Sequence, residues 1–473
     1  MNKILHQFSS HFGHSIEFGL CCLLIMFFTF STFGQSTIAE VRAYGGNLNE
    51  EANQIIECQD GGYVVVGNTG SDQANNSNIY VIKIDQDLNC IWSKSIGGSN
   101  SERGYSVLEN ENQELLICGV TNSFGYGGYD AVVYKINADG DIIWQKTFGG
   151  TDWDFGYKIV KHPGAGYLLC GMRNLPESEV SLGYLVHLNE QGQSINEWTY
   201  QSELNEEIVD IDFTDLDEII LTGNRFDDSS EIRFGIVRRL GSDGQELGVQ
   251  IIGGEDDYTN ILNAEIYEGK YYHAGYKMHN SVLNSFVSAI ELDGTVLFND
   301  DQVFTQEETY NDIMIANGLV YTAGRSRVVG YGGFDGIVYA RSLDGWFQGA
   351  FFYGNTSDEA FNSMILNSSG QLVTTGYRTV NQTQKDFLVM KYLSPILTSE
   401  NIMSPTYMSC FTTDLVELSH NESDFILKQY YTFNGQLVAE LKANEVVEIQ
   451  GGLYITVTTD SQGNKYYSKE FRE

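Results

Sequence analysis

Two copies of one sequence pattern decide the fold of this chain. The first copy is Asn78-Ile-Tyr-Val-Ile-Lys-Ile84, followed by Ile91-Trp-Ser-Lys-Ser-Ile-Gly-Gly98. The second is Asp130-Ala-Val-Val-Tyr-Lys-Ile136, followed by Ile143-Trp-Gln-Lys-Thr-Phe-Gly-Gly150, and it lies 52 residues further on in both halves. A fixed period of this length is typical of repeat folds built from one supersecondary unit.

The period continues through most of the chain and is marked by a glycine near the end of the second strand of each unit. These glycines are Gly67, Gly119, Gly171, Gly223, Gly275, Gly324 and Gly376. Each unit contains four short runs rich in Val, Ile, Tyr and Phe, which we name strands A to D, and Asp-Gly turns often separate C from D. Such runs, separated by turn residues, are typical of antiparallel strands. Seven four-stranded units predict an all-β protein with a seven-bladed β-propeller.

The ends of the repeat predict how the ring closes. Residues 37–46 match a strand D that has no preceding A, B or C, and residues 359–393 supply A, B and C without a strand D. The N-terminal strand is therefore expected to complete the seventh blade, so that the first and last parts of the propeller are joined.

The chain divides into four predicted segments. Residues 1–34 have the apolar run and small residues of a secretory signal peptide. Residues 36–393 are the propeller, 394–403 a linker, and 404–473 a small C-terminal β-sandwich with its own strand rhythm. No later run is apolar enough for a membrane helix, so we expect no transmembrane segment after signal cleavage.

Composition excludes several functions. The 473-residue chain has 63 acidic and 27 basic residues and a net charge of −36, which repels nucleic acid. No paired-carboxylate, Ser-His-Asp or metal-ligand spacing is present, so we predict no catalytic residue, no metal and no cofactor. Cys118 and Cys170 occupy the same repeat position, which elsewhere holds Val, Thr or Ala, and this pattern indicates a small buried site and not a reactive thiol.

Two sets of polar residues recur on the face formed by the D–A and B–C loops. Acids open the units at Glu51, Glu102, Asp154, Glu206, Asp257, Glu308 and Glu359. Two residues after each marker glycine stand Thr69, Thr121, Arg173, Arg225, Lys277, Ser326 and Arg378. Recurrence in every unit favours a structural role, in which each acid binds backbone or a nearby base; a charged rim for a cation or an anionic sugar is the alternative.

A ligand site is expected where the repeat is broken. The candidates are Trp153 and Phe155 in a D–A loop, residues 172–182, and the 328–334 loop with Tyr331 and Phe334. Arg173, Arg225 and Arg378 could add a cluster for a carboxylate. Exposed aromatic residues beside polar loops suit a carbohydrate or a protein ligand, although the same residues could simply cap the blade cores.

Two resemblances add to this interpretation. Ile91–Gly104 and Asp60–Thr69 resemble the tandem propeller repeats of secreted proteins from Bacteroidetes-type bacteria. Tyr431, Gly435-Gln436, Val438, Gly452-Leu-Tyr454 and Lys465–Phe471 resemble the C-terminal sorting domain of the type IX secretion system, although Ser404-Pro405-Thr406-Tyr407 replaces that family's opening Tyr-Pro-Asn-Pro. They imply export by that machinery through residues 404–473, to the medium or the outer surface of a Gram-negative bacterium.

The function that we predict is therefore a secreted or cell-surface binding propeller without catalysis. A glycan-active enzyme is the first alternative, because Asn137–Trp144 is similar to the aspartate box of sialidase-like propellers, without the usual spacer and the serine or threonine before the tryptophan. A lyase-like propeller belongs to the same alternative. A structural scaffold for protein partners is the second.

Overall fold

The computed structural model describes residues 38–46, 49–70, 76–175, 180–200, 202–227, 232–253, 258–300, 303–328, 333–354, 356–380 and 384–392, and the backbone of four further strands between 425 and 472. The predicted signal peptide, the linker and Tyr331 lie outside these residues, as does most of the loop that contains Tyr331. The segment boundaries predicted above therefore stay predictions.

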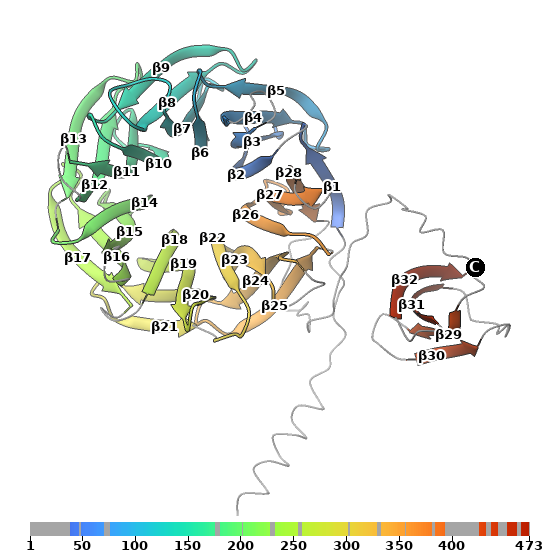
Figure 1. The fold of residues 1–473 in the computed structure, drawn as a ribbon. Coiled ribbons are helices and arrows are strands. Elements are labelled where there is room, and N and C mark those ends of the chain that lie inside the picture. Colours follow the sequence, from blue (N-terminus) through green and yellow to red (C-terminus); the bar gives the residue numbers. More distant parts are fainter. Residues whose placement is uncertain are drawn as a thin grey trace, which may run out of the picture.

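Twenty-eight strands form seven four-stranded antiparallel blades around one axis (Figure 1). The first three blades consist of β2 (Glu50–Glu57), β3 (Tyr63–Thr69), β4 (Asn78–Ile84) and β5 (Cys90–Ile96); β6 (Glu102–Glu109), β7 (Leu115–Thr121), β8 (Asp130–Ile136) and β9 (Ile142–Phe148); and β10 (Asp154–Lys161), β11 (Tyr167–Asn174), β12 (Ser181–Leu188) and β13 (Ser194–Tyr200).

The next three blades consist of β14 (Asn205–Phe213), β15 (Ile219–Asp227), β16 (Ile232–Leu240) and β17 (Glu246–Ile252); β18 (Tyr258–Tyr267), β19 (Lys270–His279), β20 (Val282–Glu291) and β21 (Val296–Asp300); and β22 (Glu308–Ala316), β23 (Leu319–Ser326), β24 (Asp335–Ser342) and β25 (Phe347–Tyr353). A single parallel pair between Arg233 and Tyr258 links the fourth blade to the fifth.

The predicted closure of the ring is confirmed. The seventh blade contains β26 (Glu359–Leu366), β27 (Leu372–Val380) and β28 (Gln384–Tyr392), and its outer strand is β1 (Ile38–Tyr44). β1 pairs antiparallel with β28 from Ile38 opposite Tyr392 to Tyr44 opposite Phe387. The first strand of the described chain therefore covers the edge that the last propeller strand would otherwise expose.

The core lies between blades. Seven clusters of buried apolar side chains fill the seven interfaces between neighbouring sheets. Cys118 and Cys170 are fully buried within this packing, as their repeat position predicts, and their thiols are free. Strand A lies innermost and strand D outermost in every blade, so the axis is lined by β2, β6, β10, β14, β18, β22 and β26 (Figure 1).

A tryptophan of strand D connects several blades to the next. Trp144 packs on Gly192, which has a φ of +72° in the C–D turn of the following blade, and a Cβ there would lie 2.7 Å from the indole. Trp198 packs in the same way on Gly244, and the Trp92 indole donates a hydrogen bond of 2.9 Å to Ala138 O. The repeated Trp and the repeated turn Gly thus form one contact.

The C-terminal strands form one antiparallel sheet. In the order of the sheet they are β30 (Leu437–Lys442), β29 (Phe425–Tyr431), β31 (Gly452–Asp460) and β32 (Lys465–Arg472). The predicted all-β tail is therefore present, and its described strands belong to a single layer.

Candidate functional site

The seven inner strands enclose a cavity of about 1110 Å³ on the propeller axis. Its wall extends from Glu51 and Glu207, near the start of their strands, to Ala316 and Leu366 at the other end. The cavity is therefore as long as the inner strands. Its volume is slightly larger than the range of small-ligand pockets, roughly 300–1,000 Å³.

A ring of side chains crosses the middle of this cavity. One residue per blade stands directly after a β-bulge in strand A, and all of these except Ser106 line the cavity: Gln54, Ser106, Lys158, Asp210, Asn263, Asp312 and Ser363. The Gln54 side chain accepts a hydrogen bond of 2.7 Å from Val107 N, and Asp312 accepts one of 2.7 Å from Met364 N. Lys158 cannot accept, and it forms an ion pair with Asp210 at 3.0 Å instead. This ring therefore holds blades together.

The cavity wall near Lys158 contains several acidic side chains. Burial raises the pKa of Asp212 to about 7, that of Asp312 to about 7 and that of Glu265 to about 8. Burial alone would lower the pKa of Lys158, but the carboxylates of Asp210, Asp312 and Asp212 together outweigh burial and raise that pKa. Within the described residues no group of three or more His, Cys, Asp or Glu side chains is arranged to hold a metal ion.

The recurring acids have the structural role that the sequence favours, with two corrections of position. Glu102, fully buried, accepts hydrogen bonds from Gly98 N at 2.9 Å and from the Thr121 hydroxyl at 2.8 Å. In the first blade this position belongs to Glu50 and not to Glu51, because Glu50 is the residue that pairs with Thr69.

In the fifth blade the same position belongs to Thr259, opposite Lys277, and the predicted Asp257 lies outside the described residues. The register of a strand depends on backbone pairing, and counting residues through loops of unequal length cannot supply it.

The three predicted arginines do not converge. Arg173 lies 3.8 Å from Asp154 and 3.4 Å from Glu197, and Arg225 donates to Glu206 at 2.9 Å. Arg378 lies 3.9 Å from Asp386 of its own blade. Each guanidinium therefore contacts acids of its own blade. The three arginines do not form the shared site for a ligand carboxylate that the sequence suggested.

An aromatic strip leads from the rim to the cavity. Trp153 contacts Tyr129 and Phe155, with ring centroids 5.5 and 6.3 Å apart, and Phe155 stacks on Tyr157 at 5.9 Å. Tyr157 then meets Tyr105 at 5.5 Å, and both tyrosines line the cavity. The strip therefore joins the predicted residues Trp153 and Phe155 to the axis.

The outer end of the strip is exposed on tightly held loops. Trp153 is 53% exposed, Tyr126 is 76% exposed, and Phe124 is 41% exposed. Tyr126 N donates to Asp130 at 3.1 Å, and a Cβ on Gly128 would lie 2.1 Å from the Trp153 ring. The aromatic surface is thus fixed before any ligand arrives.

Phe334 has a different place from the one expected. It is only 6% exposed, and it lies beneath the guanidinium groups of Arg325 and Arg327, which are 4.3 and 4.1 Å from its ring centroid. Phe334 therefore supports two cations and does not present an aromatic surface to a ligand.

Sequence reasoning missed Arg325. The residue directly after the marker glycine is Asn68, Val120, Met172, Asn224, Tyr276, Arg325 or Tyr377. Tyr276, Arg325 and Tyr377 line the cavity on three successive blades. Arg325 is the one charged residue of that set, and this break in the repeat was the signal available in the sequence.

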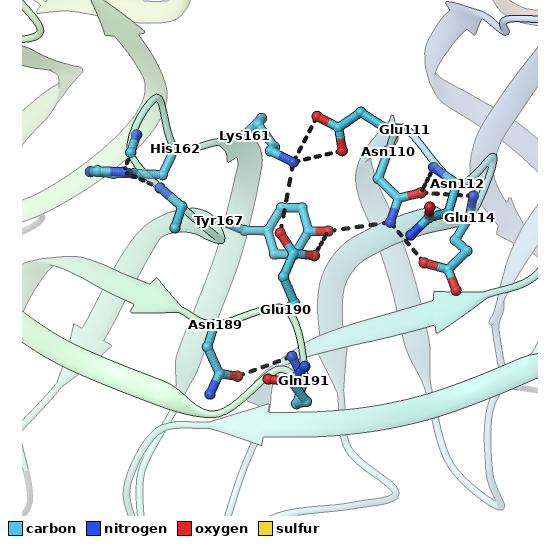
Figure 2. Close-up of polar contacts among 12 residues, drawn as sticks. Asn110, Glu111, Asn112, Glu114, Lys161, His162, Tyr167, Asn189, Glu190 and Gln191 are labelled. Carbon is cyan, nitrogen blue, oxygen red and sulfur yellow. Dashed lines mark hydrogen bonds and ion pairs between the residues drawn. The ribbon is translucent and has the colours of Figure 1, made fainter.

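The opposite face carries a polar network that holds blades together (Figure 2). The Tyr167 hydroxyl donates to Glu190 at 2.5 Å and accepts from Asn110 Nδ2 at 3.3 Å, and Lys161 bridges Glu111 at 2.8 Å and Glu190 at 3.7 Å. Burial raises the pKa of Tyr167 well above its usual range. The side chains of this network connect the second blade to the third, and we therefore assign the network a structural role.

The comparisons with known proteins support the fold. The chain matches no family model and no curated protein sequence. The WD40 domain of Neurospora crassa Pan2 is similar with a TM-score of 0.50 and 11% identity, over 77% of this chain and 98% of that one. The polysaccharide lyase Uly1 has a TM-score of 0.49 at 8% identity, over 78% and 94%.

A protein of unknown function from Dyadobacter fermentans has a TM-score of 0.44 at 10% identity, over 75% and 98%. At these identities the likeness concerns the propeller fold alone. No helix among the described residues has the length and apolar character needed to cross a membrane.

Proposed function

We propose that the chain is a non-catalytic binding propeller that holds a carbohydrate chain on the face of its D–A and B–C loops. The observation that carries this proposal is the aromatic strip, which begins at the exposed Trp153 and ends at Tyr157 and Tyr105 in the cavity, with exposed Tyr126 on the adjoining B–C loop. Sugar rings pack their apolar faces on exposed aromatic side chains, and loops that are already ordered lose little entropy on binding.

The experiment is a glycan-array screen of the full mature chain, followed by incubation of every bound glycan with the protein to look for cleavage. Trp153→Ala and Tyr126→Ala are expected to weaken binding at least tenfold. Trp346→Ala is the matched control, because Trp346 is also 75% exposed but lies in a C–D turn on the other face. Cleavage of a bound glycan would replace this proposal with an enzyme, and equal losses in all three variants would place the ligand elsewhere.

We further propose that the protein is secreted or displayed on the cell surface, with residues 404–473 read by the type IX machinery. The support is the resemblance of the tail motifs and the four antiparallel strands that the tail forms. A reporter fused to residues 404–473 should reach the surface or the medium of a type IX-competent bacterium, and should stay inside when the tail is removed. Retention of the tailed reporter would contradict the proposal.

A further inference from the structure

The described arginines divide into two groups by their partners. Eight of the eleven whose side chains the structure describes contact a carboxylate within 4.0 Å. The other three are Arg103, Arg325 and Arg327, and none of them has an ion pair within the described part of the chain. Arg103 stands at the start of β6, and Arg325 and Arg327 stand at and after the end of β23, so all three lie on the face of the D–A and B–C loops.

Unpaired guanidinium groups are unexpected in this protein. Acids outnumber bases by 63 to 27, so a surface arginine should find a carboxylate easily. The neighbouring Arg233 does so, since it binds Glu207. The residues 329–332 next to Arg327 in the chain are Val-Gly-Tyr-Gly and carry no acid. These four residues therefore supply no carboxylate to Arg327.

Arg325 is held in place without an ion pair among the residues that the structure describes. Its guanidinium lies 4.3 Å from the ring centroid of the buried Phe334, which orients the cation through the face of the ring. Tyr276 of the fifth blade and Tyr377 of the seventh occupy the equivalent positions on either side, and all three line the cavity. The Arg325 guanidinium and the side chains of the two tyrosines thus line the same cavity.

From this arrangement we infer that the mouth of the cavity binds an acidic sugar residue, whose oxyanion is taken by Arg325 between Tyr276 and Tyr377. The inference rests on the proposed carbohydrate-binding function and specifies its substrate class. A guanidinium presents parallel N–H donors that match a carboxylate or a sulfate bidentately. The cavity that would receive the sugar is already present in the structure.

The test compares charged polymers with neutral partners of the same backbone. Binding of the full chain is measured by calorimetry to polygalacturonate, polyglucuronate and alginate, each beside its carboxyl-reduced form, and to a sulfated galactan beside the desulfated one. Poly-glutamate tests an acidic peptide. The variants are Arg325→Gln, Arg325→Lys and Trp153→Ala. The control is Arg239→Gln, which removes an arginine that is paired with Glu218 at 3.1 Å.

We expect at least one acidic polymer to bind tenfold or more tightly than its neutral form, with an affinity that falls as salt rises. Arg325→Gln should abolish that preference, Arg325→Lys should restore only part of it, and Arg239→Gln should retain it. Comparing the affinities for the carboxylated polymers and for the sulfated galactan shows which oxyanion the site prefers. Thermal melting of each variant checks that it is folded.

Three results would overturn the inference: equal binding of acidic and neutral forms, an unchanged preference in Arg325→Gln, or binding of poly-glutamate alone. Neutral glycan binding that depends on Trp153 would leave the proposed function in place and remove only the acidic specificity. If no polysaccharide binds, both proposals fail.

Discussion

At the scale of single residues, the repeat places the same contacts in successive blades, and these contacts differ in chemistry from one blade to the next. Glu102 and Glu206 occupy one position and are both fully buried. Glu102 accepts from neutral groups, whereas Glu206 binds Arg225 at 2.9 Å and also Arg238, whose side chain is only 2% exposed. A recurring acid can thus accept hydrogen bonds from neutral donors in one blade and be the counterion of a buried cation in another.

This difference predicts unequal costs for one substitution. Glu206→Gln should lower the free energy of unfolding by about 3 kcal/mol, because it leaves buried Arg238 with one carboxylate fewer. Glu102→Gln should cost about 1 kcal/mol, because the amide oxygen can still accept from Gly98 N and the amide N–H can donate to the Thr121 hydroxyl. Urea unfolding of both variants checks the order. A larger loss in Glu102→Gln would show that charge is not what distinguishes the two blades.

The turn glycine under Trp144 should be sensitive for two separable reasons. Gly192→Ala places a Cβ at a φ of +72° and 2.7 Å from the indole, and it should cost about 2 kcal/mol or more. Gly370→Ala shares the positive φ of +73° but meets no atom within 4 Å, so it should cost about 1 kcal/mol. Gly248→Ala has neither constraint. Denaturant melts of the three variants should follow this order, and equal losses at Gly192 and Gly370 would exclude the packing contribution.

At the scale of elements, strand β1 closes the ring because it covers β28 and adds apolar side chains to the last blade. Val41 packs against the cluster between the sixth and seventh blades, and Arg42, its neighbour, points to solvent. Side chains alternate between the two faces of a strand.

The alternation gives a matched pair of substitutions within β1. Val41→Asp should lower the free energy of unfolding by about 2 kcal/mol, because it buries a charge against the apolar cluster. Arg42→Asp should change it by less than about 1 kcal/mol, since the side chain is exposed. The measurement is thermal melting, with light scattering to detect association through the β28 edge. Equal effects would mean that β1 contributes through its backbone alone.

At the scale of the whole molecule, seven inner strands bring acids from different blades into one cavity. The folded pKa of Asp212 and Asp312 is about 7 and that of Glu265 about 8, all above the values of an unfolded chain, roughly 4. The folded state therefore binds more protons than the unfolded state between about pH 4 and pH 8. The stability contributed by these groups is present below the unfolded pKa and is lost as pH rises through the folded pKa.

We therefore expect the melting temperature to fall as pH is raised from 6 to 9. Asp312→Asn should reduce that fall, because the amide cannot ionise. Buried His273, whose pKa is lowered to about 3, acts in the opposite direction below about pH 6.5, since only the unfolded chain gains its proton there. Calorimetric scans from about pH 4 to pH 9 measure both effects. A melting temperature that rises toward pH 9 would contradict the assignment of these three acids.

The sequence alone determined the all-β class, the seven blades and the closure by β1, because each follows from the spacing of strands and turns along one chain. It also located Trp153 and Phe155, which break the repeat. Only the tertiary structure decided which residues meet across blades. In the structure, Arg173, Arg225 and Arg378 each lie beside acids of their own blades. Phe334 packs under the guanidinium groups of Arg325 and Arg327. Arg325 itself lies on the cavity wall between two tyrosines. The pairing register within a blade depends on which backbone groups meet across loops of unequal length. The convergence of seven strands on one axis depends on contacts between blades, whose equivalent residues lie about 50 positions apart. No local pattern records either.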